Sequence, residues 1–440
     1  MNAYYLIGEH LTHSFSAEIH RRFGRYEYEL QELDPGELAG FLTRRAFLGL
    51  NVTIPYKEAV IPYLDHLDPQ AAAIGAVNTV VNRNGTLWGY NTDFGGMAAS
   101  LLRLSCCAAG RDCSEQPALQ VKTVLILGTG GTSKTALAVC RALGAGKALR
   151  LSRTGREEAL SYAEGQELGR DAAWIINCTP AGMFPDLDGQ ALSLGKDTAC
   201  HSERSEESAF FPRLQAVFDC VYNPLRTRLV LEAQARGIPA AGGLYMLVKQ
   251  AALACQHFTG LPVEEAEAEA IYRTLHRAQE NLVLIGMPGA GKTTVGRLLA
   301  EKTGKAFVDV DEEIVRRTGK TIPAIFASEG ETGFRDLESA VIRDLFDQGG
   351  RVIAAGGGSV LRRENVLRLR QNGRLLFLDR PLAALTPTPD RPLSDTMDKL
   401  QMLYAQRRPS YLAAADQVVP NGDDLAHTLD TILKQEDFLL

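Results

Sequence analysis

The stretch NLVLIGMPGAGKTT, residues 281–294, decides the fold of the C-terminal third of this chain. A run that is typical of a buried strand leads into the spacing G-x-x-x-x-G-K-T at residues 286–293, and the helix-periodic segment 295–302 follows it. Glycines let the backbone turn its N–H groups toward phosphate oxygens, and the N-terminus of the next helix attracts the same anion. The stretch therefore predicts a phosphate loop in a parallel α/β domain.

This loop is expected to bind ATP together with a metal ion. Lys292 is placed to bridge the β- and γ-phosphates, and the Thr293 hydroxyl is placed to ligate Mg²⁺. In FVDVD, residues 307–311, side-chain alternation predicts that Asp309 and Asp311 share one face of a strand. Asp309 then suits the metal site, and Asp311 suits a base that orients an acceptor hydroxyl. We expect the loop's ATP contacts to come from Gly289, Ala290, Gly291, Lys292, Thr293 and Thr294.

Four further motifs follow the phosphate loop. They are Phe334-Arg335-Asp-Leu-Glu338, Gly356-Gly-Gly358, Arg391-Pro-Leu393 and Arg407-Arg-Pro-Ser-Tyr411. In this order, over residues 280–420, they resemble shikimate kinase. The resemblance implies that Arg391 lies on a lid that contacts ATP and stabilises the transferred phosphoryl group. It also implies that shikimate is held by Asp311, Arg335, Gly357 and Arg407.

One segment departs from that family. Between the expected strand 375–378 and Arg391 the chain is short and rich in proline (TPTPDRPL, residues 386–393). This leaves the adenine contacts open and suggests a stiffer lid.

A second glycine loop, in VKTVLILGTGGTS at residues 121–133, also follows a strand-like run. Strand, glycine loop and helix in this order predict a Rossmann-like dinucleotide site, although Ser133 replaces the last glycine of the usual spacing. The next expected strand, 148–151, is followed by Ser152-Arg153-Thr154 where an NAD site usually carries an acidic residue, and an arginine there favours the 2′-phosphate of NADP over NAD. The expected NADP contacts are Gly128, Thr129, Gly130, Gly131, Ser152, Arg153, Thr154 and Gly243.

Polar clusters surround this unit. They are His13-Ser14-Phe-Ser16, Asn51-Val-Thr53-Ile-Pro-Tyr-Lys57, Gly75-Ala-Val-Asn78-Thr79, Gly89-Tyr-Asn91-Thr-Asp93, Asn177-Cys-Thr-Pro-Ala-Gly-Met183, Asp219-Cys-Val-Tyr222-Asn-Pro224 and Met246-Leu-Val-Lys-Gln250. The order of these motifs and the residues in them resemble shikimate dehydrogenase over residues 1–275. The resemblance implies reduction of 3-dehydroshikimate by NADPH, with Lys57 and Asp93 as the catalytic pair. It implies substrate contacts from Ser14, Ser16, Thr53, Lys57, Asn78, Asp93, Tyr222 and Gln250.

The fold expected from both resemblances is α/β throughout. A substrate domain, residues 1–96 plus 241–278, and a Rossmann-like NADP domain, residues 97–240, would enclose the first site in a cleft. A P-loop domain of the nucleoside-monophosphate-kinase type would occupy residues 279–440. The polar run HSERSEES, residues 201–208, is expected to be a solvated loop inserted relative to the family.

Composition limits the partners, the cellular location and the cysteine chemistry that can be expected. The net charge of −6 gives no reason to expect nucleic acid or an acidic membrane as partner, and no signal peptide or membrane span is evident. A cytoplasmic location is therefore expected. The eight cysteines match no zinc template and are expected to be reduced, although the group at Cys106, Cys107 and Cys113 leaves metal binding open.

We therefore predict one enzyme with two consecutive activities, which uses NADPH, ATP and Mg²⁺. The product implied for the first half is the substrate implied for the second. Two alternatives remain: a metabolite-sensing regulator built from degenerate copies, and a dehydrogenase half that accepts quinate or NAD. The oligomeric state stays open.

Overall fold

The computed structural model describes residues 3–12, 14–109, 119–120, 122–153, 155, 159–195, 211–345, 349–387, 393–422 and 424–434. The chain divides into two compact units that meet between Thr274 and Leu275. Helix α9 (Glu265–Gln279) runs through this boundary. The run 201–208 and Cys113 lie outside the described residues. No helix in the described part of the chain is both long and apolar enough to cross a membrane.

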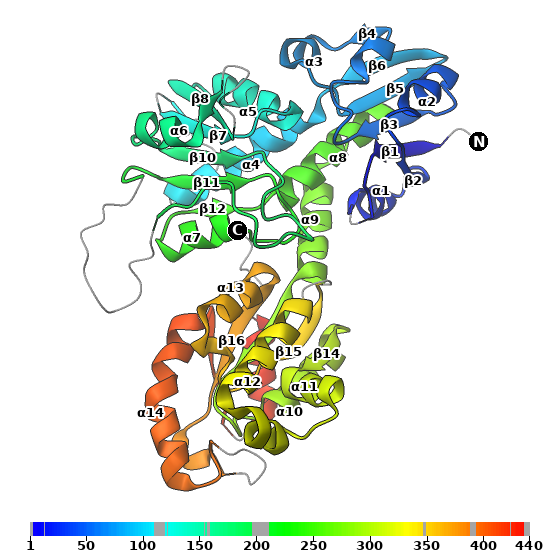
Figure 1. Ribbon diagram of the computed structural model, residues 1–440. Helices are drawn as coiled ribbons and strands as arrows, with labels where there is room; N and C mark the ends of the chain where they lie inside the picture. The colour runs from blue at the N-terminus through cyan, green and yellow to red at the C-terminus, as the bar shows by residue number, and fades with distance from the viewer. Residues whose placement is uncertain are drawn as a thin grey trace. The chain divides into compact units, whose positions relative to one another are not determined.

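The first unit opens with a mixed six-stranded sheet, which together with its helices we call the first lobe (blue in Figure 1). The strand order is β2-β1-β3-β5-β6-β4, and β5 runs antiparallel to both of its neighbours. Ile7, Leu50 and Val80 are fully buried in its core. The elements are β1 (Tyr4–Gly8), α1 (Ser16–Phe23), β2 (Tyr28–Glu32), α2 (Leu38–Arg44), β3 (Gly49–Val52), η1 (Ile61–Tyr63), β4 (His66–Leu67), α3 (Pro69–Ile74), β5 (Thr79–Arg83) and β6 (Thr86–Tyr90).

A second six-stranded sheet forms the second lobe, and all of its strand pairs are parallel. Its order, β12-β11-β10-β7-β8-β9, reverses direction between β7 and β10. Both central strands are almost completely buried, as expected for a parallel sheet that is covered on both faces. The elements are β7 (Thr123–Leu127), α5 (Gly131–Ala142), β8 (Lys147–Ser152), β9 (Leu160–Ser161), α6 (Tyr162–Leu168), β10 (Trp174–Asn177), β11 (Ala216–Asp219), α7 (Arg228–Ala235) and β12 (Ala240–Ala241).

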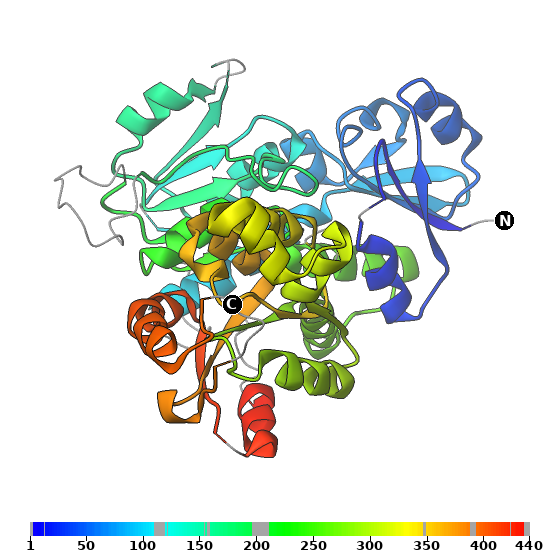
Figure 2. The ribbon, with the colours of Figure 1, turned by 60° about the horizontal axis from the view of Figure 1, so that its bottom comes forward.

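Two helices join these lobes. Helices α4 (Thr92–Ala109) and α8 (Leu244–Thr259) pack side by side, as Figures 1 and 2 both show. A Cβ on Gly96 would lie only 2.7 Å from the Met246 carbonyl oxygen, so the two helices approach closely at a residue without a side chain. Met246 belongs to the core of the second lobe, whereas the ring of Phe258, near the end of α8, contacts that of Tyr4 in the first lobe in a tilted arrangement. Helix α8 therefore contacts both lobes.

The second unit is a parallel five-stranded sheet in the order β14-β15-β13-β16-β17. The phosphate-loop strand β13 is central and fully buried. The last strand, β17, was not expected from the sequence. The elements are β13 (Asn281–Ile285), α10 (Lys292–Thr303), β14 (Ala306–Asp309), α11 (Val310–Thr318), α12 (Ile322–Asp344), β15 (Arg351–Ala354), η3 (Ser359–Leu361), α13 (Arg363–Asn372), β16 (Gly373–Asp379), η4 (Leu382–Ala384), α14 (Met397–Ala414), β17 (Gln417–Pro420) and α15 (Leu425–Lys434).

The predicted placement of Asp309 and Asp311 on one strand face is wrong. Strand β14 ends at Asp309, and Asp311 lies in the first turn of α11. The Asp309 carboxylate caps this helix by accepting hydrogen bonds from the backbone N–H groups of Asp311 and Glu312. Helix capping ends the strand here, so the alternation rule no longer applies at Asp311.

Candidate active sites

The first site is built around a buried ion pair. Lys57 lies in the turns that follow β3, and Asp93 lies in the first turn of α4. The Lys57 Nζ donates to Asp93 Oδ2 at 2.6 Å, and the two side chains are only 15% and 8% exposed. The same Nζ lies 3.4 Å from Thr132 Oγ1 in the second lobe. The fold thus brings together two residues whose contact sequence spacing alone could not establish.

Amide and hydroxyl groups from three distant segments meet beside this pair. Asn78 Oδ1 accepts a hydrogen bond from the Thr92 backbone N–H at 2.7 Å, which fixes the orientation of the Asn78 amide. Asn78 Nδ2 donates to Thr92 Oγ1 at 3.0 Å and to Gln250 Oε1 at 3.3 Å. Thr92 was quoted within a motif but was not expected as a site residue. The sequence did offer one indication that Thr92 belongs to the site, because Thr92 directly precedes Asp93.

Ser14, Ser16 and Tyr222 form a second polar group. Ser14 Oγ accepts a hydrogen bond from the Ser16 backbone N–H at 3.2 Å. Burial raises the pKa of the Tyr222 hydroxyl, and a hydrogen bond with Ser14 opposes that shift. The Tyr222 ring lies 5.3 Å from that of Phe15. Thr53 follows β3 directly, and a Cβ on Gly8 would lie 2.6 Å from its methyl group, so the backbone of β1 passes close to this side chain.

The first glycine loop has the geometry of a dinucleotide site. Gly128 has a φ of +108°, and Gly130 caps the N-terminus of α5. A Cβ on Gly131 would lie 3.3 Å from the Lys57 Cβ, so the loop packs directly against the chain segment that carries the ion pair. Thr129 lies between Gly128 and Gly130 in this loop.

The end of β8 offers groups for the ribose phosphate. Ser152 Oγ is buried and has no hydrogen-bond partner within the described residues, while the neighbouring Arg153 is exposed. A hydroxyl group without a partner among the described residues, next to an exposed arginine, suits the binding of a sugar phosphate. Thr154 lies outside the described residues. Gly243 caps α8, where a Cβ would lie 2.2 Å from the Cys220 carbonyl oxygen.

In the second unit the side chain of Lys292 lies back over the phosphate loop. Gly286, Gly289 and Gly291 all have positive φ angles, of +146°, +78° and +82°. Lys292 Nζ donates to the carbonyl oxygens of Gly286 and Met287 at 2.9 and 3.0 Å and is 8% exposed. Its ammonium group therefore lies over the loop.

Two oxygen ligands for a hard cation lie together beside this lysine. The Thr293 hydroxyl donates to Asp309 Oδ2 at 2.6 Å. A hydroxyl and a carboxylate at this distance are the kind of donor set that Mg²⁺ binds beside a nucleotide. Ala290 is held from outside by Asn421, whose Nδ2 donates to the Ala290 carbonyl oxygen at 2.6 Å. Thr294 follows Thr293 in the first turn of α10.

The expected acceptor side contains two buried arginines. Arg335 and Arg407 are 8% and 4% exposed, and the Nε atom of each has no partner within the described residues. Arg335 Nη1 donates to Glu338 Oε2 at 2.9 Å, as the three-residue spacing predicted, and Arg407 Nη1 donates to the Gly357 carbonyl oxygen at 3.0 Å. Burial, together with neighbouring Arg335, lowers the pKa of Arg407. Glu331 Oε1 lies 3.4 Å from Arg335 Nη2 and 3.8 Å from Arg407 Nη2, so the two guanidinium groups are close enough together to bind one carboxylate.

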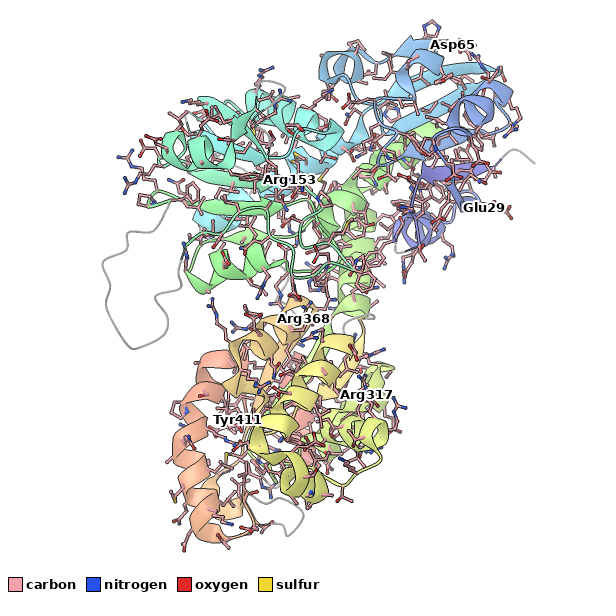
Figure 3. The ribbon with its side chains drawn as sticks, in the orientation of Figure 1. Glu29, Asp65, Arg153, Arg317, Arg368 and Tyr411 are labelled. Carbon is pink, nitrogen blue, oxygen red and sulfur yellow. The ribbon has the colours of Figure 1, made fainter. Side chains whose placement is uncertain are left out.

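Other groups around these arginines were not expected. Ser359 Oγ donates to Glu338 Oε1 at 2.7 Å. Tyr411, labelled in Figure 3, stacks on Phe377 of β16, and its hydroxyl donates to the Gly357 carbonyl oxygen. A Cβ on Gly356 would lie 3.1 Å from Asp311 Oδ1, so this glycine admits Asp311 to the same region. Arg391 lies outside the described residues.

Known proteins resemble each half of the chain. The family profile described as Shikimate dehydrogenase substrate binding domain matches residues 6–80, and the one described as Shikimate kinase matches residues 288–436. A shikimate dehydrogenase (NADP(+)) of Clostridium perfringens is 32% identical over 294 residues, which is 62% of this chain and 98% of the relative. A shikimate kinase of Nitrosomonas europaea is 46% identical over 149 residues, which is 32% of this chain and 71% of the relative.

Solved structures agree for the first unit. Shikimate dehydrogenase 1 from Peptoclostridium difficile has a TM-score of 0.53 and 30% identity, over 62% of this chain and 98% of its own. A chorismate mutase/shikimate 5-dehydrogenase fusion protein from Clostridium acetobutylicum has a TM-score of 0.52 and 28% identity, over 62% and 97% of the chains. The protein thus belongs to the shikimate dehydrogenase family over its first unit and to the shikimate kinase family over its second, as a bifunctional, NADP- and ATP-dependent enzyme of the shikimate pathway.

Proposed function

We propose that the first unit uses NADPH to reduce 3-dehydroshikimate to shikimate, with the Lys57–Asp93 pair supplying the proton, and that the phosphate-loop unit phosphorylates shikimate at its 3-hydroxyl. The observation that carries the first role is the 2.6 Å ion pair, which is largely screened from solvent. The observation that carries the second is the pair of buried arginines with unpaired Nε atoms, in the same compact unit as the phosphate loop.

In the first reaction NADPH supplies hydride to the substrate carbonyl carbon. The Lys57 ammonium group is placed to donate a proton to the oxygen as negative charge develops on it, because Asp93 holds the ammonium in one direction. Asn78 and Gln250 present amide groups that match a substrate rich in hydroxyls, together with Ser14, Ser16, Thr53 and Tyr222. Ser152 and Arg153 would bind the 2′-phosphate, which explains a preference for NADP over NAD.

In the second reaction Lys292 neutralises the phosphates, and Thr293 with Asp309 would hold Mg²⁺. Arg335 and Arg407 would clamp the carboxylate of shikimate with the planar fork that this anion favours. Asp311 would accept the hydrogen bond of the acceptor hydroxyl and orient it toward the γ-phosphate. We retain Arg391 as the lid arginine on the strength of the family resemblance alone.

The test is a pair of assays on one preparation. NADPH oxidation with 3-dehydroshikimate reports the first site, and ADP release with shikimate reports the second. Lys57→Ala should lower only the first activity, by about 100-fold or more, since removal of a general acid costs that much. Lys292→Ala should abolish only the second, so each variant is the other's control. Loss of both activities from either change, with the chain still folded, would show that the two sites are not independent.

A further inference from the structure

Two cysteines lie side by side at the ends of neighbouring strands of the second lobe. Asn177 of β10 pairs with Asp219 of β11, so the next residues, Cys178 and Cys220, are also neighbours. Their Sγ atoms are 3.9 Å apart, and both residues are only partly buried. Neither thiol takes part in the reduction proposed above.

Hydrogen bonds of Asn177 and Asp219, the residues that precede the two cysteines, keep the strand ends in register; we call this group, with Thr227, the polar clamp. Asn177 Nδ2 donates to Asp219 Oδ1 at 2.9 Å. Asp219 also accepts hydrogen bonds from the Val221 N–H at 3.0 Å and from the Thr227 hydroxyl at 2.6 Å. Because Asn177, Asp219 and Thr227 are buried, the hydrogen bonds of the polar clamp keep the two cysteines next to each other at the strand ends.

The pair occupies the edge of the sheet at which a dinucleotide binds. Strand order reverses between β7 and β10, and ligands of such sheets lie outside the carboxyl ends of the strands at that reversal. A Cβ on Gly128 would lie 3.4 Å from the Cys178 carbonyl oxygen, so Cys178 borders the glycine loop. The Cys220 backbone packs against Gly243 at the start of α8, and the Asp93 charge contributes to raising the pKa of its thiol. The thiols therefore border both the cofactor loop and the catalytic pair.

The geometry permits a bond between the sulfurs. Neighbouring strands are about 4.8 Å apart, which lies within the Cα separations of roughly 4.4–6.8 Å that disulfides span. Closing 3.9 Å to a bond of about 2.05 Å needs only side-chain rotation with a small approach of the strand ends. Cys140 provides the contrast, because it is fully buried, whereas Cys178 and Cys220 are only partly buried. An inert packing role suits Cys140 better than it suits this pair.

We propose that Cys178 and Cys220 form a redox-sensitive dithiol, which a hydroperoxide converts to a disulfide that switches off the dehydrogenase alone. The Cys178 thiolate attacks a peroxide oxygen, the O–O bond breaks, and the sulfur becomes a sulfenic acid while hydroxide leaves. The Cys220 sulfur then attacks that sulfenic sulfur, the S–S bond forms, and the departing hydroxide takes the Cys220 proton as water. Two thiols are oxidised, and one hydrogen peroxide is reduced to two waters. The hydrogen bond with Cys178 and burial both raise the pKa of Cys220 and keep its thiol protonated, which leaves the first attack on peroxide to Cys178.

Closure would alter the cofactor side of the site. Drawing the strand ends together moves Thr179, whose methyl group would contact a Cβ on Gly128 at 3.2 Å, and the Cys220 carbonyl, which packs on Gly243. Displacements of about 1 Å at a catalytic site cost on the order of 100-fold in rate. The second unit contains neither thiol, so its kinase activity is an internal control within the same molecule.

The experiment treats the full chain with hydrogen peroxide, quenches it, and follows both activities with peptide mass mapping. We expect dehydrogenase activity to fall at least about tenfold, with kinase activity within about twofold of its start, and dithiothreitol to restore the loss. The 178 and 220 peptides should be joined with loss of two hydrogens, and bound NADP⁺ should slow the reaction. Cys178→Ala and Cys220→Ala should each prevent the reversible loss, whereas Cys106→Ala should not.

Either of two results would overturn the proposal: no linkage between the two peptides, or the same reversible loss in both alanine variants. Activity of the reduced protein is measured first. Its absence would count against the proposed function, whereas its insensitivity to peroxide would count against the dithiol.

Discussion

The substitution Gly358→Ala tests the acceptor site of the kinase unit most sharply. A Cβ at this position would lie 2.1 Å from Arg335 Cζ and 2.2 Å from Nη2. Contacts of carbon atoms become ordinary only beyond 3.4 Å, so the guanidinium group must retreat by roughly 1 Å. It cannot do so freely, because Glu338 is fully buried and holds Nη1 at 2.9 Å.

The expected effect follows from that displacement. A shift of about 1 Å in a group that positions substrate lowers kcat/KM by about 100-fold, which corresponds to roughly 2.7 kcal/mol. The loss should appear in kcat/KM for shikimate, while KM for ATP stays near its wild-type value because the phosphate loop is untouched. ADP release at varied shikimate measures it, and the dehydrogenase activity of the same sample calibrates the amount of protein.

Gly422→Ala is the matched control. Among the described residues, and apart from its own chain neighbours, no atom lies within 4 Å of its added Cβ, and its backbone has no left-handed φ, so this variant should behave as wild type. A folded Gly358→Ala enzyme with kcat/KM for shikimate within about twofold of wild type would refute the role given to Arg335. Equal losses toward shikimate and ATP would indicate general damage to the unit, which also contradicts the reasoning.

Three further predictions concern pH, cofactor choice and metal. Burial lowers the pKa of His20 to about 3. Below pH 6.5 the unfolded chain therefore binds a proton at His20 that the folded chain does not bind. The free energy of unfolding consequently falls as the pH falls from 6.5 toward 3. The loss at pH 5 is about 2 kcal/mol, and His20→Phe should flatten the melting-temperature profile between pH 7 and 5; a profile parallel to wild type would contradict this. Arg153→Ala should raise KM for NADPH about tenfold with little effect on NADH, and an unchanged preference would remove Arg153 from the 2′-phosphate site. Chelation of Mg²⁺ should stop ADP release while NADPH oxidation continues, and restored Mg²⁺ should reverse it.

The parts of each site that follow directly from a strand were predictable from the sequence. Both glycine loops lie where strand, loop and helix predicted them, and Arg335 and Glu338 meet because a helix places residues three apart together. The error at Asp309 and Asp311 came from extending strand alternation past a cap. The sequence Asp309-Val-Asp-Glu312 carries the signal, because an acidic cap followed three residues later by glutamate is typical of a helix start.

Contacts between distant segments were not readable from residue spacing. The Lys57–Asp93 contact joins residues 36 positions apart, and the Asn78–Gln250 contact joins residues 172 apart. Only tertiary folding brings such groups together, so family resemblance was the sole guide to them. The thiol pair belongs to the same class, since its residues are 42 positions apart and no local pattern connects them.

The acceptor site of the kinase unit lowers the stability of the free protein, because it holds buried hydrogen-bond donors that have no partner within the described part of the chain until a substrate binds. A buried donor without a partner costs about 1–3 kcal/mol, more when charged, and Arg335 and Arg407 each present such an Nε atom. Arg335 donates from Nη1 to Glu338 at 2.9 Å and from Nη2 to Glu331 at 3.4 Å, and Arg407 donates from Nη1 to the Gly357 carbonyl oxygen at 3.0 Å, which leaves both Nε atoms without a partner among the described residues. A carboxylate that satisfied the remaining donors would recover this free energy on binding. The same unsatisfied groups that lower the stability of the unit alone thereby raise its affinity for an anionic acceptor.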